Sequence, residues 1–143
     1  MSTNQFSTFL VDDRLYGVNI RVVQEITKSM AITEVPLAPV HVKGLINLRG
    51  QIATAVGLRE LFELNASHKE NGKINVVCKS EAYLLSLVVD EVGDVLELDD
   101  LLFDPTPETV SPGVSKFMSG VYKLPDNLLS VIDIQKIIDF LNV

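Results

Sequence analysis

The sequence has few of the side chains that enzymes and disulfide-bonded proteins depend on. It contains one cysteine, two histidines and no tryptophan in 143 residues. A single cysteine, Cys78, excludes an internal disulfide and gives no indication of an oxidising compartment. It follows Val76 and Val77 in an apolar run. We therefore expect a small buried hydrophobic side chain at this position rather than a reactive thiol.

Motifs that carry catalysis or bind metals are also missing. His41 and His68 fall in expected loops without zinc-ligand spacing, and the sequence contains no P-loop, GxGxxG or GxSxG motif. The acidic stretch 99–104 lacks the spacing and the glycine of a calcium loop. Asp90 follows an apolar strand with no histidine near it in sequence, which favours a turn or cap role over catalysis. We expect no catalytic residues, no metal and no cofactor.

Basic charge and long apolar runs are scarce as well. The chain carries 12 basic and 19 acidic residues, a net charge of −7, which disfavours binding to nucleic acid or to an anionic membrane surface. The longest apolar stretch, Ala82 to Val89, is interrupted by Ser86 and is far shorter than the roughly 20 residues that cross a bilayer. The first residues resemble no signal peptide. We expect a soluble, cytoplasmic protein.

What the chain does have is valine, isoleucine and leucine in short runs bounded by turn signals. Apolar residues make up 47% of the sequence, enough to build a core. Short strands between turns predict an all-β fold of small barrels or a sandwich. For Val22–Ile26, the pattern fits either a strand or a helical turn. The expected strands cover residues 6–11, 15–20, 44–49, 51–56, 74–78, 82–89, 94–98 and 128–132, with a further apolar segment at 114–123.

Two short helices are expected in addition. Gly57–Phe62 has a second-rank N-cap in Gly57 and a glutamate at the third helical position. The C-terminal helix, about 133–141, has a better N-cap in Asp133. Its apolar residues repeat with helical spacing, which indicates a face packed on the core. These residues are Ile134, Ile137, Ile138 and Leu141.

We expect a single domain, 1–143, made of two lobes. The polar segment Asn65–Gly72 is rich in turn-forming residues and is the best candidate for a link between them. On this reading, lobe 1 covers roughly residues 14–64. Lobe 2 covers roughly residues 74–133 together with the N-terminal strand.

Residues 44–50 form the most informative segment, Gly44-Leu45-Ile46-Asn47-Leu48-Arg49-Gly50. Its apolar residues should be buried, and Gly50 can take the positive φ of a tight turn, so Arg49 would be held on a rigid support. Glu25 is the matching charge in an otherwise apolar segment. The two residues either form an ion pair, which would orient Arg49 for recognition, or are independent exposed charges; the sequence leaves both open.

Over about residues 6–141, the chain resembles the CheW-like domains, the adaptors of bacterial chemotaxis. The resemblance implies two five-stranded, SH3-like β-barrels packed on a shared hydrophobic core. No single matching segment is specific, but the ordered series is. The segments are Tyr16-Gly17-Val18, Val23-Gln24-Glu25-Ile26, Pro39, Gly44–Gly50, Leu58-Arg59, Val88-Val89-Asp90, Ser119-Gly120 and Leu129–Ile138.

The same resemblance implies a function. CheW-like adaptors have no catalytic activity and join the cytoplasmic helical hairpin of chemoreceptors to the regulatory domain of the histidine kinase CheA. This would recruit a cytoplasmic protein to membrane receptor arrays through its partners. Receptor binding is expected in the groove between the barrels and kinase binding on a separate face of the first barrel. The implied receptor-binding residues are Val23, Glu25, Gly44, Arg49, Val88 and Val89, and the implied kinase-binding residues are Ile32, Glu34 and Ile52.

The chain departs from the family pattern at Gly57, where CheW-like domains usually carry an aspartate. That difference leaves a divergent paralogue, or a CheV-type or kinase regulatory module serving another receptor–kinase system, as an alternative. A small barrel that binds nucleic acid is a more distant alternative. The acidic charge disfavours it, and so does the lack of interleaved basic and aromatic residues.

Overall fold

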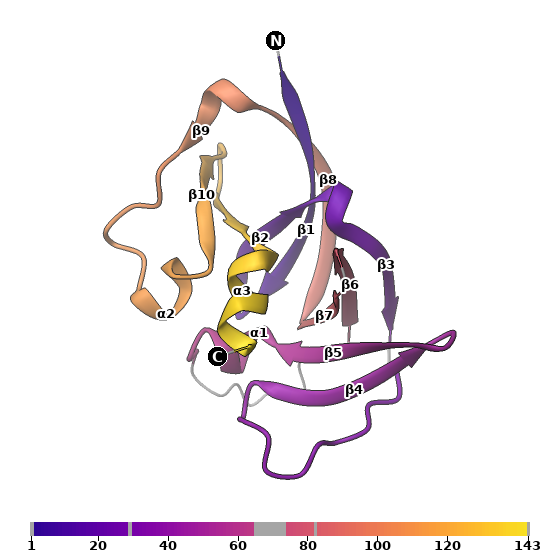
Figure 1. Cartoon of the computed structure of the whole chain (residues 1–143). Helices are drawn as coiled ribbons and strands as arrows, with labels where there is room; N and C mark the ends of the chain where they lie inside the picture. The colour runs from indigo at the N-terminus through magenta and orange to yellow at the C-terminus, as the bar shows by residue number, and fades with distance from the viewer. Residues whose placement is uncertain (1, 29, 65–73, 82, 143) are drawn as a thin grey trace.

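Two β-sheets make up most of the molecule in the computed structural model, which describes residues 2–28, 30–64, 74–81 and 83–142 (Figure 1). The first sheet has six strands in the order β8-β1-β2-β11-β10-β9. Most neighbours are antiparallel, but β2 and β11 run parallel. The strands are β1 (Thr3–Val11), β2 (Arg14–Asn19), β8 (Glu91–Asp99), β9 (Phe103–Asp104), β10 (Met118–Lys123) and β11 (Leu128–Ile132).

The second sheet has five strands in the order β3-β6-β7-β5-β4. Its hairpins β4–β5 and β6–β7 are joined through a parallel pairing of β5 with β7. The predicted mostly-β class is confirmed, although the first sheet gains a sixth strand in the two-residue β9. The strands are β3 (Val23–Lys28), β4 (Val42–Leu48), β5 (Gln51–Gly57), β6 (Ile74–Ser80) and β7 (Tyr83–Val89).

Short helical segments connect and cover the sheets. The 3₁₀ turn η1 (Ile20–Val22) directly precedes β3, so the ambiguous segment is a helical turn followed by a strand. The predicted C-terminal helix is α3 (Ile134–Leu141), and the Asp133 carboxylate accepts a hydrogen bond from the amide of Gln135 at 3.0 Å as its N-cap. The others are η2 (Asp100–Leu102), α1 (Leu58–Leu61) and α2 (Pro112–Ser115).

One core joins the two sheets. The largest buried cluster combines Phe9 and Tyr16 from the six-stranded sheet, Leu85 and Leu87 from the five-stranded sheet, and Ile137 from α3. In Figure 1, α3 lies between the sheets. Burying each large apolar side chain contributes about 2 kcal/mol, so separating the sheets would expose much of what stabilises the fold. Cys78 belongs to this cluster, as predicted.

The two sheets divide the chain differently from the expected lobes. The five-stranded sheet is built from one continuous stretch, 23–89, and the six-stranded sheet from the segments before and after it. As a result, β2 pairs with β1 and β11, while β6 and β7 pair with β3 and β5. Strand periodicity shows where strands are but not which strands pair. The expected link, Asn65–Gly72, lies outside the described residues.

Candidate functional site

A two-residue turn holds Arg49 at the tip of the β4–β5 hairpin. Leu48 pairs with Gln51, so only Arg49 and Gly50 form the turn. Both have positive φ, 51° and 90°, the geometry of a type I′ turn, whose twist matches that of the flanking strands. The Asn47 side-chain oxygen accepts a hydrogen bond from the Gly50 amide at 3.0 Å. Positive φ was predicted for Gly50 but not for Arg49.

Arg49 and Glu25 form an ion pair. The Arg49 Nη1 lies 2.9 Å from Glu25 Oε1, and Nη2 lies 3.5 Å from Oε2, so the guanidinium faces both carboxylate oxygens. Glu25 is on β3, one edge of the five-stranded sheet, and the hairpin that carries Arg49 includes β4, the other edge. Figure 1 shows the hairpin tip beside the end of β3. The pair therefore links the two edges of one sheet.

The exposed fractions of the two side chains indicate that the pair serves recognition more than folding stability. The side chain of Arg49 is 79% exposed and that of Glu25 is 21% exposed. An exposed ion pair contributes about 0–1 kcal/mol to folding, so this contact adds little stability. Its main effect is to hold a charged, multi-donor group in one orientation at the surface, which suits binding of a partner.

Gly44 has a structural reason to be glycine. The backbone of Thr33 makes two hydrogen bonds with that of Leu45, at 2.9 and 2.8 Å, and this packs the segment before β4 against Gly44. The φ of Gly44 is 145°, and a Cβ there would collide with the Thr33 carbonyl oxygen and lie 2.7 Å from Ile32 Cγ2. Gly44 is also buried. It shapes the surface beside β4 rather than offering a side chain to a partner.

Comparison with known proteins identifies the family to which the chain belongs. The sequence profile described as the CheW-like domain matches residues 5–141. The chain belongs to the CheW-like domain family. It is 29% identical to the chemotaxis protein CheW of Klebsiella aerogenes over 94% of this chain and 81% of that protein. It is 28% identical to the CheW of Treponema pallidum over 93% and 81%.

A solved CheW structure has the same fold. The crystal structure of the scaffolding protein TtCheW from Thermoanaerobacter tengcongensis superposes with a TM-score of 0.82 at 27% identity. The match covers 92% of this chain and 90% of that one. The two-sheet arrangement with a C-terminal helix is therefore a CheW-like fold.

Two of the residues carried over from the family are not at the surface. Val88 is 5% exposed and Val89 is fully buried. Val88 packs with Ile46 and Leu48 inside the five-stranded sheet, and Val89 packs in the main core. The sequence implied that these two side chains contact a receptor, but neither reaches the surface, because the second half of β7 is covered on both faces. Val23, by contrast, is half-buried at the edge of the main core.

The residues expected to bind the kinase lie around the outer face of the β4–β5 hairpin. Ile52 is 56% exposed and pairs with Asn47, Glu34 is exposed and Ile32 is half-buried. The Thr33–Leu45 bridge sets this segment beside β4. Leu45, 36% exposed, adds apolar surface that the sequence analysis did not single out. Its neighbours in the strand are buried, so alternation along β4 was the available signal.

A partly buried charge network connects the two sheets. Arg59 of α1 lies 3.1 Å from Asp12 Oδ1 and 2.7 Å from Asp90 Oδ2. The Asp90 carboxylate also accepts a hydrogen bond from the Asp12 amide. Burial works against the charge of Arg59, but hydrogen bonds and attraction from both aspartates outweigh it and raise the pKa of the guanidinium. Asp90 thus has the structural role that its position after a strand predicted.

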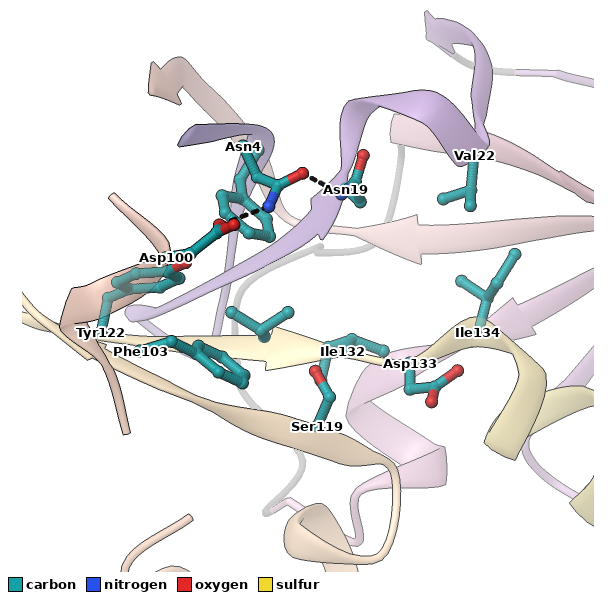
Figure 2. A pocket seen from close by; sticks show the side chains of 12 residues that line it. Asn4, Asn19, Val22, Asp100, Phe103, Ser119, Tyr122, Ile132, Asp133 and Ile134 are labelled. Atoms are coloured by element: carbon teal, nitrogen blue, oxygen red, sulfur yellow. Dashed lines mark hydrogen bonds between the residues drawn. The ribbon is translucent and has the colours of Figure 1, made fainter. Parts of the chain in front are cut away.

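A cavity of about 410 Å³ opens beside the six-stranded sheet, away from Arg49. Figure 2 shows its polar rim: Asn19 donates a hydrogen bond to Asn4, whose amide group donates to Asp100. Tyr122 lies beside Asp100, and its pKa is raised by burial and by the negative charges of Asp100 and Asp99. No motif marked these residues, because they come from strands far apart in the sequence.

Metal-ligating residues do not gather in the described part of the chain. Within residues 2–28, 30–64, 74–81 and 83–142, no group of three or more His, Cys, Asp or Glu side chains has the arrangement to hold a metal ion. Burial raises the pKa of the Cys78 thiol to about 12. Among the described helices, none has the length and apolar character needed to cross a bilayer.

Proposed function

We propose that this chain is an adaptor without catalytic activity that couples chemoreceptors to the histidine kinase CheA. Membership of the CheW-like family and similarity to a protein named as a scaffold support this proposal. The observation that carries it is the oriented, 79% exposed guanidinium of Arg49, paired with Glu25 on a rigid hairpin. In such a role the protein would work in the cytoplasm and reach membrane arrays through its partners.

The receptor-binding surface in this proposal centres on Glu25 and Arg49, with Val23 beside them on β3. A receptor hairpin presents amphipathic helices, whose apolar face suits an apolar groove and whose polar edge can be aligned by an oriented charge. Gly44 contributes indirectly, by allowing the close approach of Thr33. This set omits Val88 and Val89, whose side chains are buried.

The kinase-binding surface in this proposal is the outer face of the β4–β5 hairpin. Ile52 and Leu45 supply exposed apolar side chains there, and Glu34 supplies a neighbouring charge. Ile32 packs beneath this face. The surface is next to the hairpin tip but does not include the Arg49 side chain, so the two partners would bind simultaneously.

Co-sedimentation with purified partners tests the proposal. We expect the protein to bind a receptor cytoplasmic fragment and a CheA regulatory domain, first separately and then in one complex. Arg49→Glu should weaken receptor binding roughly tenfold or more while kinase binding persists. Ile52→Glu should do the reverse. Arg14→Glu, an equal charge change on an exposed arginine of β2, is the matched control and should alter neither.

Two results would contradict the proposal. Failure of the folded wild-type protein to bind either partner would remove the adaptor function. Equal effects of Arg49→Glu and Arg14→Glu would show that net charge, rather than the oriented guanidinium, governs receptor binding. Thermal unfolding of each variant separates loss of binding from loss of fold.

A further inference from the structure

The cavity shown in Figure 2 is built from elements at both ends of the chain. Its walls come from β1, β2, β9, β10 and β11, and η1, η2 and the start of α3 lie around it. A volume of about 410 Å³ is within the range of small-molecule sites. The cavity lies on the six-stranded sheet, whereas the Arg49–Glu25 pair lies on the five-stranded sheet, so an inference about it does not rest on the proposed adaptor function.

Aromatic rings form one end of the cavity. The ring centroids of Phe6 and Tyr122 are 5.4 Å apart with planes at 59°, and those of Phe103 and Tyr122 are 5.1 Å apart with planes at 49°. Phe6 and Tyr122 are only 5% and 3% exposed, so Phe103 offers most of the aromatic surface at this end. The face of an aromatic ring carries partial negative charge and attracts cations. Phe103 is 38% exposed, so this end is accessible from solvent.

The charged groups of the lining are all acidic. Asp100 lies next to Tyr122 in Figure 2, and Asp133 lies further along the cavity beside Ile134. The lining residues, all of them in the described part of the chain, include no lysine, arginine or histidine. Asn4 donates to Asp100 and so fixes its carboxylate at the rim. A cation entering beside Phe103 would meet the Asp100 carboxylate and the aromatic end of the cavity without displacing a resident positive charge.

The remainder of the lining combines aliphatic side chains with the uncharged polar residues Asn4, Asn19 and Ser119. Val131 and Ile132 of β11, Val22 of η1 and Ile134 of α3 extend the cavity away from the aromatic end. This part suits an apolar chain or ring and offers no charge to compete with Asp100. The Asp133 carboxylate is half-buried and serves as the N-cap of α3. Asp100 is exposed, and Asn4 contacts only one of its two carboxylate oxygens, so the other can receive the cation of a ligand.

We propose that this cavity binds a small organic cation, a primary ammonium group attached to an apolar body. The charged group lies between the Asp100 carboxylate and the aromatic end of the cavity, where Phe103 is the exposed ring. The apolar body lies along Val131 and Ile132. Such a ligand would bridge η2, β9, β10 and β11 and thereby stabilise the six-stranded sheet.

Phenethylamine, phenethyl alcohol and hydrocinnamate test the charge requirement, because they share a phenyl group and differ mainly in charge. Titrations of the full chain, followed by amide NMR near neutral pH, should show phenethylamine shifting signals of the lining residues. Its dissociation constant should be roughly tenfold lower than that of the alcohol, the size expected for a charge-assisted contact combined with cation–π attraction. Hydrocinnamate should bind more weakly than the alcohol.

Variants assign the effect to the cavity. Asp100→Asn keeps the shape and should abolish the preference for the amine over the alcohol. Phe103→Ala should weaken both. Asp126→Asn removes the same charge in the turn between β10 and β11, outside the lining, and should leave both affinities unchanged. Thermal unfolding confirms that each variant is folded.

Three outcomes would overturn the proposal. Equal affinities for the three probes, or no shifts at the lining residues, would show that the cavity does not select a cation. An unchanged preference in Asp100→Asn would place the selectivity elsewhere. Tighter binding of N-acetyl-arginine amide than of phenethylamine would reassign the cavity to a side chain of a partner protein.

Discussion

At the scale of single residues, two local features hold Arg49 in place: one acts on its backbone and the other on its side chain. Its backbone has the positive φ of a hairpin turn, and its guanidinium faces the Glu25 carboxylate. Positive φ is unusual for a residue with a long side chain. Here a type I′ turn requires it, and the neighbouring Gly50 and the Asn47 hydrogen bond support that turn. The guanidinium therefore has few orientations to lose when a partner binds, which favours affinity.

A charge exchange tests this contact. Glu25→Lys and Arg49→Glu should each reduce receptor binding, and the double variant should recover part of the loss because it restores an ion pair. Each single change should alter the free energy of unfolding by no more than about 1 kcal/mol, since the pair is exposed. A double-mutant cycle measures receptor affinity and the free energy of unfolding for the wild type, the two single variants and the double variant. Strictly additive effects on binding would mean that the pairing has no role in it.

Cys78 provides a second test at this scale. Its pKa is raised to about 12 by burial, whereas an unfolded thiol has a pKa of about 8.5. Near pH 8 the thiolate fraction is therefore roughly a thousandfold lower in the folded protein. Iodoacetamide should modify the folded protein at least that much more slowly than the protein in guanidinium chloride, as followed by mass spectrometry. Similar rates in both conditions would show that the thiol is accessible.

At the scale of elements, local signals were sufficient for most strands and helices. Gly50 between two apolar runs predicted the β4–β5 hairpin, and Asp133 before a helical apolar repeat predicted α3. Strand pairing depends on contacts distant in sequence, so the parallel pairs and β9 were not predictable. The same limit applies to the sites. The Arg49–Glu25 pair was left open, the burial of Val88 and Val89 was missed, and the cavity beside Asn4 and Asp100 carried no local pattern.

Gly57, the residue before α1, stands where the family resemblance implied an aspartate, and its surroundings show what occupies that space. Lys43 of β4 forms an ion pair with Glu60 of α1. A Cβ at position 57 would collide with the Glu60 carboxylate and lie 2.7 Å from Lys43 Cε. The flexible ends of these two side chains lie in the space beside Gly57, the position at which the family resemblance implied an aspartate. We infer a local exchange of partners, in which Glu60 pairs with Lys43 where that aspartate would otherwise do so.

This explanation predicts a compensated substitution. Gly57→Asp should destabilise the protein by about 1 kcal/mol, because the new carboxylate lies against Glu60 and displaces Lys43. Adding Glu60→Ala should recover most of that loss, because Lys43 can then pair with the new carboxylate. Urea unfolding of the two single variants and the double variant measures the interaction. Additive losses would contradict the exchange of partners.

At the scale of the whole molecule, the Arg59 network fixes one sheet to the other. Arg59 follows β5 of the five-stranded sheet, Asp12 is in the turn between β1 and β2 of the six-stranded sheet, and Asp90 lies between β7 and β8. The Asp90 amide also donates to the Leu10 carbonyl oxygen. These contacts act together with the shared core, so the relative position of the proposed receptor surface and the cavity is fixed.

Removing the arginine tests this connection. Arg59→Met keeps the apolar stem but leaves Asp12 and Asp90 without their cation, so the free energy of unfolding should fall by about 3 kcal/mol. That is the low end for breaking a buried pair, because the Asp12 side chain is 39% exposed. Urea unfolding makes the measurement, with Arg21→Met in η1 as the exposed control. A loss below that of the control would show that the network is dispensable.

The order of strands along the chain also bears on how the molecule is made. All five strands of the sheet that carries Arg49 have left the ribosome once residue 89 has emerged, whereas the other sheet waits for β11, which ends at Ile132. Until then β2 lacks its parallel neighbour and leaves an open edge on the nascent chain. Synthesis from the N-terminus thus favours early pairing of the strands in the five-stranded sheet. The six-stranded sheet is completed last, when β11 pairs with β2 and α3 packs on the core.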